Sequence, residues 1–279
     1  MSTTFARGTV VFVGAGPGDP ELLTLRGKAA IEQADLVVYA DSLVHPGITE
    51  LARPDAEVIG SSSLTLEQAL ERMIAAARAG LLVARVQSGD PSLYGAIHEQ
   101  MVALDRAGVD YTIVPGVSSA FAAAARLKAE LTVPEVAQTV VFTRVPSRTT
   151  IPERERLREM AAQGGTIVLF LSVGVIERVV AELLAGGLSP TTPAAVLHRV
   201  TWEDELVLRG TLENIAARAR GAGLTKQAII LVGPALDPEL RRLAVDNRSK
   251  LYDPAYSHSF RLANGRGRRR GDLGSDRGS

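Results

Sequence analysis

Three glycine-containing loops carry the residues whose types and spacing could form a ligand site. Each follows a run of apolar residues, and they read G-A-G-P-G-D-P at 14–20, Q-S-G-D-P-S-L-Y-G at 87–95 and P-G-V-S-S at 115–119. Loops of this kind lie at the carboxyl edge of a parallel sheet, where bare backbone can approach a small ligand closely. The triplet Gly-Asp-Pro occurs at 18–20 and again at 89–91. Ordinary turns would explain each loop separately, but the recurrence favours one shared site.

The first loop does not match two familiar phosphate-binding patterns. A dinucleotide fingerprint requires a third glycine at the position that Asp19 occupies. A P-loop requires Gly-Lys followed by Ser or Thr, but here Gly27-Lys28 is followed by Ala29. Pro17 has no N–H donor and Asp19 adds a carboxylate, so both are unfavourable for cradling a polyanion. The sequence therefore predicts a ligand other than a phosphate, with a purely structural turn as the alternative.

The remaining polar residues give no pattern typical of a nucleophilic or metal centre. The chain has no cysteine and no G-x-S-x-G motif, and its four histidines lack metal-ligand spacing. Arg144 and Arg148 follow an expected strand and could clamp carboxylates, although a solvated loop is equally compatible. Asp41 also follows an expected strand, where it could either cap a neighbouring turn or take part in the ligand site. We expect no metal.

The composition is that of an ordinary globular protein. The 279 residues are 46% hydrophobic and 22% charged, with 31 basic and 31 acidic side chains. This balance does not indicate a nucleic-acid or membrane partner. No signal peptide is recognisable and no apolar run approaches about 20 residues, so we expect a soluble cytoplasmic protein.

Strands and helices alternate along the chain, which predicts an α/β fold. In the first half the expected strands are 10–13, 36–39, 58–59, 81–86 and 111–114, with a helix capped by Asp19, a helix that a capping box starts at Thr65, and a helix over 96–107. In the second half, strands are expected at 140–143, 166–171, 194–200, 205–210 and 228–232, with helices at 153–163, 175–184 and 212–220. The strands at 194–200 and 205–210 are close enough to form a hairpin.

These elements group into two α/β domains with mixed sheets and a ligand cleft between them. The first domain is expected over residues 1–127, a connection over 128–138 and the second domain over 139–240. An extension follows over 241–279, and its Gly- and Arg-rich composition predicts disorder from about 261.

Taken together and in this order, the three loop motifs resemble the tetrapyrrole methylases. The resemblance extends to about residue 238. The segments Y-A-D-S-L-V from Tyr39, S-G-D-P-S-L-Y-G-A-I-H-E-Q from Ser88 and T-R-V-P-S-R-T from Thr143 are most similar to a branch of cobalamin synthesis. The uroporphyrinogen-III branch typically has other residues where this chain has Ser88 and Ser92. The ribosomal-RNA branch has an Ile-Gly-Asn loop where this chain has Gly16-Pro17-Gly18.

The resemblance implies an enzyme that binds S-adenosylmethionine in the cleft, methylates a tetrapyrrole and forms a homodimer. By motif matching, the cofactor would contact Pro17, Ser88, Gly89, Asp90, Leu93, Ser118, Ser119, Leu171, Val200 and Ala228. The macrocycle would be held by Asp41, His98, Arg144 and Arg148. Since the methylated carbon becomes quaternary, we expect no obligatory general base.

Three alternatives remain open from the sequence. The substrate could carry cobalt or be metal-free. The chain could instead be an RNA methylase, which would show a basic face. It could also be a sensor that binds the cofactor without transferring the methyl group.

Overall fold

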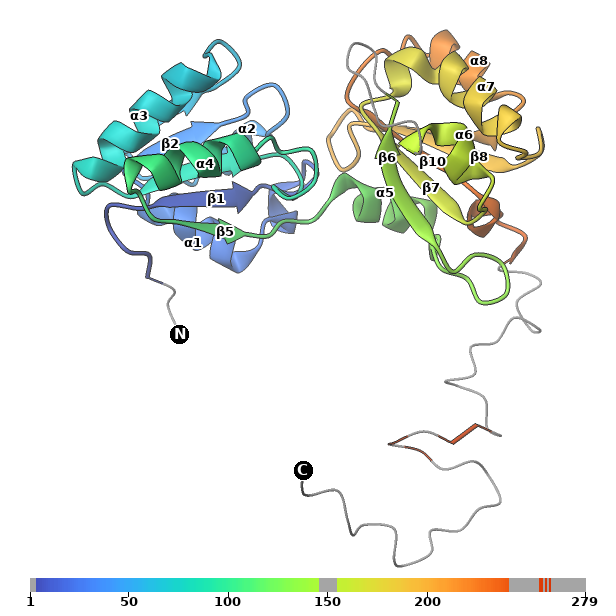
Figure 1. The fold of residues 1–279 in the computed structure, drawn as a ribbon, viewed down its shortest axis with the longest axis horizontal. Helices are drawn as coiled ribbons and strands as arrows, with labels where there is room; N and C mark the ends of the chain where they lie inside the picture. Colours follow the sequence, from blue (N-terminus) through green and yellow to red (C-terminus); the bar gives the residue numbers. More distant parts are fainter. Residues whose placement is uncertain (1–3, 146–154, 241–255, 258, 260, 262–279) are drawn as a thin grey trace, which may run out of the picture.

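The computed structural model describes residues 4–145 and 155–240, together with 256, 257, 259 and 261. It contains two five-stranded sheets, each with helices on both faces (Figure 1). The predicted fold of two α/β domains is confirmed, although only the second of the two sheets is mixed. Arg148 and most of the extension at 241–279 lie outside the described residues. None of the described helices has the length and apolar character needed to span a membrane.

The first sheet is parallel throughout, with the strand order β3-β2-β4-β1-β5. All five residues of β1 are buried, which accounts for its unbroken apolar run, because a central parallel strand is covered on both faces. The strands are β1 (Val10–Gly14), β2 (Leu36–Tyr39), β3 (Glu57–Gly60), β4 (Val83–Gln87) and β5 (Tyr111–Val114).

Two pairs of helices cover this sheet. The helices α1 (Leu25–Gln33) and α2 (Pro46–Thr49) pack on one face, while α3 (Leu66–Arg78) and α4 (His98–Ala107) pack on the other. The capping box predicted for α3 is present. The Thr65 N–H donates to Gln68 Oε1 at 2.9 Å, and the Gln68 N–H donates to Thr65 Oγ1 at 3.3 Å.

Two helix starts differ from the sequence expectation. Asp19 caps a short 3-10 turn, Pro20–Leu22, and α1 begins only at Leu25, where the Thr24 hydroxyl accepts from the Gly27 N–H. The helix expected from residue 96 begins at His98. Ala96 has a φ of 49°, which lies in the left-handed region and cannot belong to a right-handed helix.

The second sheet is mixed, with the strand order β6-β7-β10-β8-β9. Only β6 and β7 pair in parallel. The pairs β7–β10, β10–β8 and β8–β9 are antiparallel, and β8 and β9 form the predicted hairpin. The strands are β6 (Val140–Arg144), β7 (Thr166–Phe170), β8 (Pro193–His198), β9 (Leu206–Thr211) and β10 (Ala228–Val232), and one face is covered by α6 (Leu157–Ala161), α7 (Ile176–Ala185) and α8 (Ile215–Gly221).

The helix α5 (Ser119–Leu127) follows the first sheet in sequence but packs on the second (Figure 1). Its small side chains, including Ala120 and Ala123, are buried against Val168, Leu197 and Leu231. The chain therefore passes from one sheet to the other between β5 and α5. The predicted connection at 128–138 comes after this crossing.

Glycines allow the three loops at the carboxyl edge of the first sheet to touch through their backbones. A Cβ on Gly14 would lie 2.5 Å from the Gly116 nitrogen, and a Cβ on Gly116 would lie 2.1 Å from the Gly89 oxygen. Gly16 and Gly89 exchange two backbone hydrogen bonds, at 3.2 and 2.7 Å. The loops thus form one continuous wall.

Replacing Gly116 with alanine should lower the free energy of unfolding by about 3 kcal/mol, because the new methyl group collides with rigid backbone rather than with a movable side chain. Gly221→Ala is the control, since no atom lies within 4 Å of its Cβ position. That change should be neutral or stabilise by up to about 1 kcal/mol. Urea denaturation measures both, and equal effects would contradict the backbone collision.

Candidate functional site

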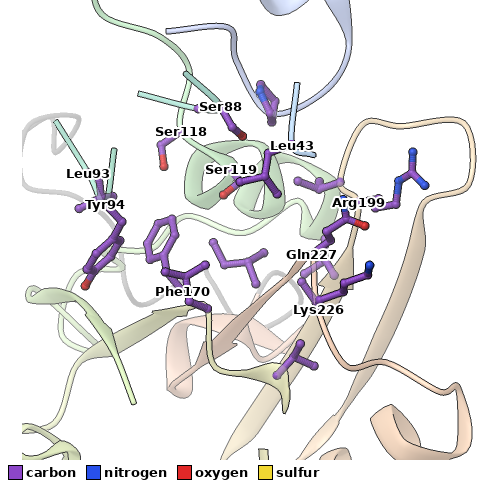
Figure 2. A pocket seen from close by; sticks show the side chains of 18 of the residues that line it. Leu43, Ser88, Leu93, Tyr94, Ser118, Ser119, Phe170, Arg199, Lys226 and Gln227 are labelled. Carbon is purple, nitrogen blue, oxygen red and sulfur yellow. The ribbon is translucent and has the colours of Figure 1, made fainter. Parts of the chain in front are cut away.

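A cleft of about 290 Å³ lies between the two sheets, and Figure 2 shows its lining. The first domain contributes the loops after β1 and β4. The second contributes the chain after β7, the chain after β8 and the start of β10, while Ser118 and Ser119 begin α5. All ten residues expected to contact a cofactor line this cleft: Pro17, Ser88, Gly89, Asp90, Leu93, Ser118, Ser119, Leu171, Val200 and Ala228. The structure therefore brings these distant segments together; what they bind is a separate question.

Asp90 connects two of the loops. One carboxylate oxygen accepts from the Gly116 N–H at 2.9 Å, and the other accepts from the Ser92 N–H at 2.9 Å and from the Ser92 hydroxyl. Burial raises the pKa of Asp90, but the hydrogen bonds from Ser92 and Gly116 outweigh it and leave the pKa below the ordinary value. This side chain is an ionised brace between the loops.

Ser118 shows the same combination of structure and exposure to the cleft. Its hydroxyl accepts from the Ala120 N–H at 3.3 Å and so caps α5, and the side chain also lines the cleft (Figure 2). The helix is thereby fixed with its amino end at the site, where its backbone N–H groups favour a negative group.

Several lining residues have a positive φ, a backbone conformation that is unfavourable for residues other than glycine. The φ values are 58° at Tyr94, 53° at Leu171, 45° at Arg199 and 54° at Gln227. Such conformations persist only where the surroundings enforce them, and they concentrate at functional sites. Their presence around this cleft supports its assignment as the functional site.

The two ends of the cleft differ in character. Figure 2 shows Leu93 and Tyr94 at one end and Arg199 and Lys226 at the other. The Tyr94 ring lies 5.3 Å from the Phe170 ring, centroid to centroid. One end is therefore aromatic and the other is basic.

Sequence reasoning missed most of the residues that distinguish these ends. Tyr94 stood inside a recognised motif without an assigned role. The others lie at the end of a strand, shortly after a strand or just before β10, where only their positions could have indicated them: Phe170, Arg199, Trp202, Lys226 and Gln227.

Three of the residues expected to hold a macrocycle, Asp41, His98 and Arg144, lie in the described part of the chain and are not among the residues that line the cleft. The Arg144 guanidinium lies 6.0 Å from the centre of the Tyr94 ring and so borders the aromatic end. His98 is exposed at the start of α4. Asp41 is exposed at the end of β2, and Arg148 lies outside the described residues. Arg144 is thereby placed next to a lining side chain.

Asp41 belongs to a polar network beside the sheet edge. It accepts hydrogen bonds from the N–H and the hydroxyl of Ser62, and the Ser62 hydroxyl is the main cause of its lowered pKa. Beneath it, Arg85 is buried and donates to Gln100 Oε1 at 3.1 Å and to Ser61 Oγ at 3.2 Å. Burial lowers the pKa of Arg85 to about 10, although the Asp41 charge acts in the opposite direction. Asp41 thus holds the turns after β2 and β3 together.

Within the described parts of the chain, no three His, Asp or Glu side chains are grouped so that they could hold a metal ion.

Comparison with known proteins identifies relatives over most of the chain. Residues 9–216 match the family described as Tetrapyrrole (Corrin/Porphyrin) Methylases. A protein of Methanocaldococcus jannaschii named cobalt-precorrin-4 C(11)-methyltransferase is 47% identical over 252 residues, which are 90% of this chain and 95% of that protein. A protein of Pseudomonas aeruginosa named precorrin-4 C(11)-methyltransferase is 44% identical over 231 residues, or 83% of this chain and 92% of that protein.

Solved structures show the same architecture. The X-ray structure of a cobalt precorrin-4 methyltransferase superposes with a TM-score of 0.81 at 46% identity, covering 83% of this chain and 97% of the other. A uroporphyrin-III C-methyltransferase from Thermus thermophilus, complexed with S-adenosyl homocysteine, gives a TM-score of 0.70 at 29% identity and covers 82% of this chain and 98% of the other.

The Asp90 brace predicts a pH-dependent contribution to stability. Asp90→Asn should lower the free energy of unfolding by about 2 kcal/mol at pH 7, because the amide cannot accept all the hydrogen bonds that the carboxylate accepts. Since the native pKa is depressed, this contribution is fully present above the unfolded-state value of about 3.9 and is lost as the pH falls through the native pKa.

Urea unfolding at several pH values measures this difference. Asp55→Asn is the control, because the Asp55 side chain is 75% exposed and its ion pair with Arg53 is long, at 3.4 Å. A difference between wild type and Asp90→Asn that stays constant down to pH 2.5 would show that the carboxylate charge is not responsible.

Proposed function

Because this chain belongs to the tetrapyrrole (corrin/porphyrin) methylases, we propose that it transfers the methyl group of S-adenosylmethionine to carbon 11 of precorrin-4, giving precorrin-5 in cobalamin synthesis. The observation that carries the proposal is the interdomain cleft, which collects all ten residues matched to the family's cofactor contacts. Relatives named for this reaction align along most of the chain.

The lining of the cleft suits S-adenosylmethionine, which has a flat adenine ring and a charged amino-acid part. The apolar side chains Leu171, Val200 and Ala228 from the second domain would contact one part. The glycine loops would contact the other, because Gly89 leaves its backbone accessible beside Ser88 and Asp90. The related structure that holds S-adenosyl homocysteine supports this cofactor.

The reaction needs orientation more than it needs acid–base chemistry. The carbon–sulfur bond to the methyl group breaks as the carbon–carbon bond to the macrocycle forms, and S-adenosylhomocysteine leaves with the electron pair. Carbon 11 becomes quaternary, so no proton must leave it beforehand. The residues of the cleft would hold both reactants in line and exclude water. We assign no catalytic acid or base.

The macrocycle is best accommodated at the aromatic end of the cleft. Tyr94 and Phe170 present their aromatic rings there, and two more rings extend this group. The ring centroids of Phe142 and Phe170 are 6.1 Å apart, and those of Phe121 and Phe142 are 6.0 Å apart. Arg144 borders this end and would bind a carboxylate of the macrocycle. Asp41, His98 and Arg148 remain further proposed contacts, on the basis of the motif match alone.

The cobalt-bearing substrate is the second candidate. Relatives named for cobalt-precorrin-4 and for precorrin-4 match this chain at comparable identity, so identity does not separate the two substrates. Assays with labelled S-adenosylmethionine and either macrocycle would separate them. Label in the macrocycle supports the enzyme, whereas cofactor binding without transfer to either substrate would favour a sensor.

We also propose a cytoplasmic homodimer without nucleic-acid, membrane or metal partners. The family resemblance supports the dimer, and the equal numbers of acidic and basic residues support the absence of a nucleic-acid partner. Sedimentation velocity would test the dimer. Retention on RNA that falls with added salt would favour an RNA methylase instead.

Replacing Arg144 with alanine should raise the Michaelis constant for the tetrapyrrole about tenfold and leave the affinity for S-adenosylhomocysteine unchanged, because a charge-assisted hydrogen bond to the macrocycle is lost. The Michaelis constant of Arg144→Lys should lie between those of the wild type and Arg144→Ala, since lysine keeps the positive charge but lacks the planar guanidinium group. Arg72→Ala is the control, because Arg72 lies on α3, pairs with Glu57 of β3 and is not among the residues that line the cleft. An unchanged Michaelis constant for Arg144→Ala would remove this residue from the substrate site.

A further inference from the structure

Trp202, the chain's single tryptophan, joins the two domains at the cleft. Its indole Nε1–H donates to the Pro17 carbonyl oxygen at 3.1 Å. The neighbouring Thr201 Oγ1 accepts from the Asp19 N–H at 2.9 Å. We call these four residues, with Gly18 between Pro17 and Asp19, the interdomain clasp.

Gly18 makes this approach possible. A Cβ at Gly18 would lie 2.3 Å from Trp202 Cδ1 and 3.0 Å from Thr201 Oγ1. The φ of Gly18 is not in the left-handed region, so close approach to Trp202, rather than backbone conformation, accounts for the glycine here. The second half of the G-A-G-P-G-D-P motif therefore serves contact between the domains.

The second-domain side of the interdomain clasp is held rigidly. Thr201 has a φ of 71°, and its N–H donates to Glu205 Oε2 at 2.7 Å. Glu205 in turn pairs with Arg126 of α5 at 2.6 Å. The Arg199 guanidinium also contacts the indole, 4.1 Å from the centre of the Trp202 ring. These contacts fix the indole before any ligand is bound.

On the first-domain side of the interdomain clasp, His45 packs against the Trp202 ring. The His45 ring meets the Trp202 ring edge to face at 4.9 Å, and His45 Nδ1 accepts from the Gly47 N–H to cap α2. The Gln227 side chain also donates to the Ser42 carbonyl at 2.7 Å, which adds a third hydrogen bond between the domains. The two walls of the cleft thus meet at this end through directed hydrogen bonds.

We infer that Trp202 is a positioning residue, which acts through the Pro17 carbonyl to set the spacing of the two cofactor-binding walls. Pro17 and Trp202 both line the cleft, and Val200 lies two residues before Trp202 on the opposite wall. A ligand that contacts Pro17 and Val200 together binds tightly only if this spacing is held in advance. The inference rests on the proposed function, because it takes S-adenosylmethionine as the ligand that spans the walls.

Two pairs of variants test the inference by calorimetric titration with S-adenosylhomocysteine. Trp202→Phe keeps an aromatic ring but removes the donor to Pro17, and Thr201→Val removes the acceptor for Asp19; each should weaken binding about tenfold. Thr201→Ser keeps the hydroxyl and should bind within about twofold of wild type. Tyr111→Phe is the control away from the cleft, since it removes only a long 3.4 Å hydrogen bond to Asp105.

Steady-state kinetics separates positioning from general destabilisation. Trp202→Phe and Thr201→Val should raise the Michaelis constant for S-adenosylmethionine about tenfold and change kcat less than about twofold, because the chemical step takes place in the same cleft once the cofactor is bound. Wild-type affinity in both variants, with methyl transfer intact, would overturn the inference and leave the proposed function standing. Failure of the wild-type protein to bind S-adenosylhomocysteine would overturn the proposed function as well.

Discussion

The close approach of bare backbone at the carboxyl edge of the first sheet is the constraint on which the site depends. Gly14, Gly89 and Gly116 belong to three different loops, yet a single methyl group on Gly14 or Gly116 would collide with the backbone of a neighbouring loop. Asp90 then braces the contact by accepting the Gly116 N–H. Because the loops pack against one another without side chains between them, they form a wall rather than three independent turns.

The second wall depends on how the chain crosses between the domains. The crossing occurs immediately after β5, so Ser118 and Ser119 line the cleft while the alanine-rich face of α5 packs against the second sheet. A helix that belongs to one core thereby presents its amino end to a site shared with the other. The domains are thus joined by the chain itself at α5 and by the hydrogen bonds of the interdomain clasp.

The sequence predicted the parts of this structure that depend on local pattern. Alternating strands and helices, the capping box at Thr65 and the β8–β9 hairpin follow from periodicity and turn chemistry, and all are present. The family motifs also selected residues that meet in one cleft. Local pattern could not indicate that α5 packs on the second sheet, since its alanine-rich face fits either sheet. It also could not indicate that Gly18 serves contact with Trp202, because the two are distant in sequence.

The structure is most constrained where the backbone of several segments lines the cleft. Methyl transfer from a sulfonium needs the two reactants in line and water excluded, and these requirements fall on backbone position rather than on the acidity of a side chain. Accordingly, Asp90 and Ser118 use their polar atoms to hold loops and a helix end, and strained residues such as Leu171 and Gln227 surround the cleft. If the macrocycle occupies the aromatic end as proposed, its specificity would come from that end, because the wall formed by the three glycine loops carries few side chains that could distinguish one tetrapyrrole from another.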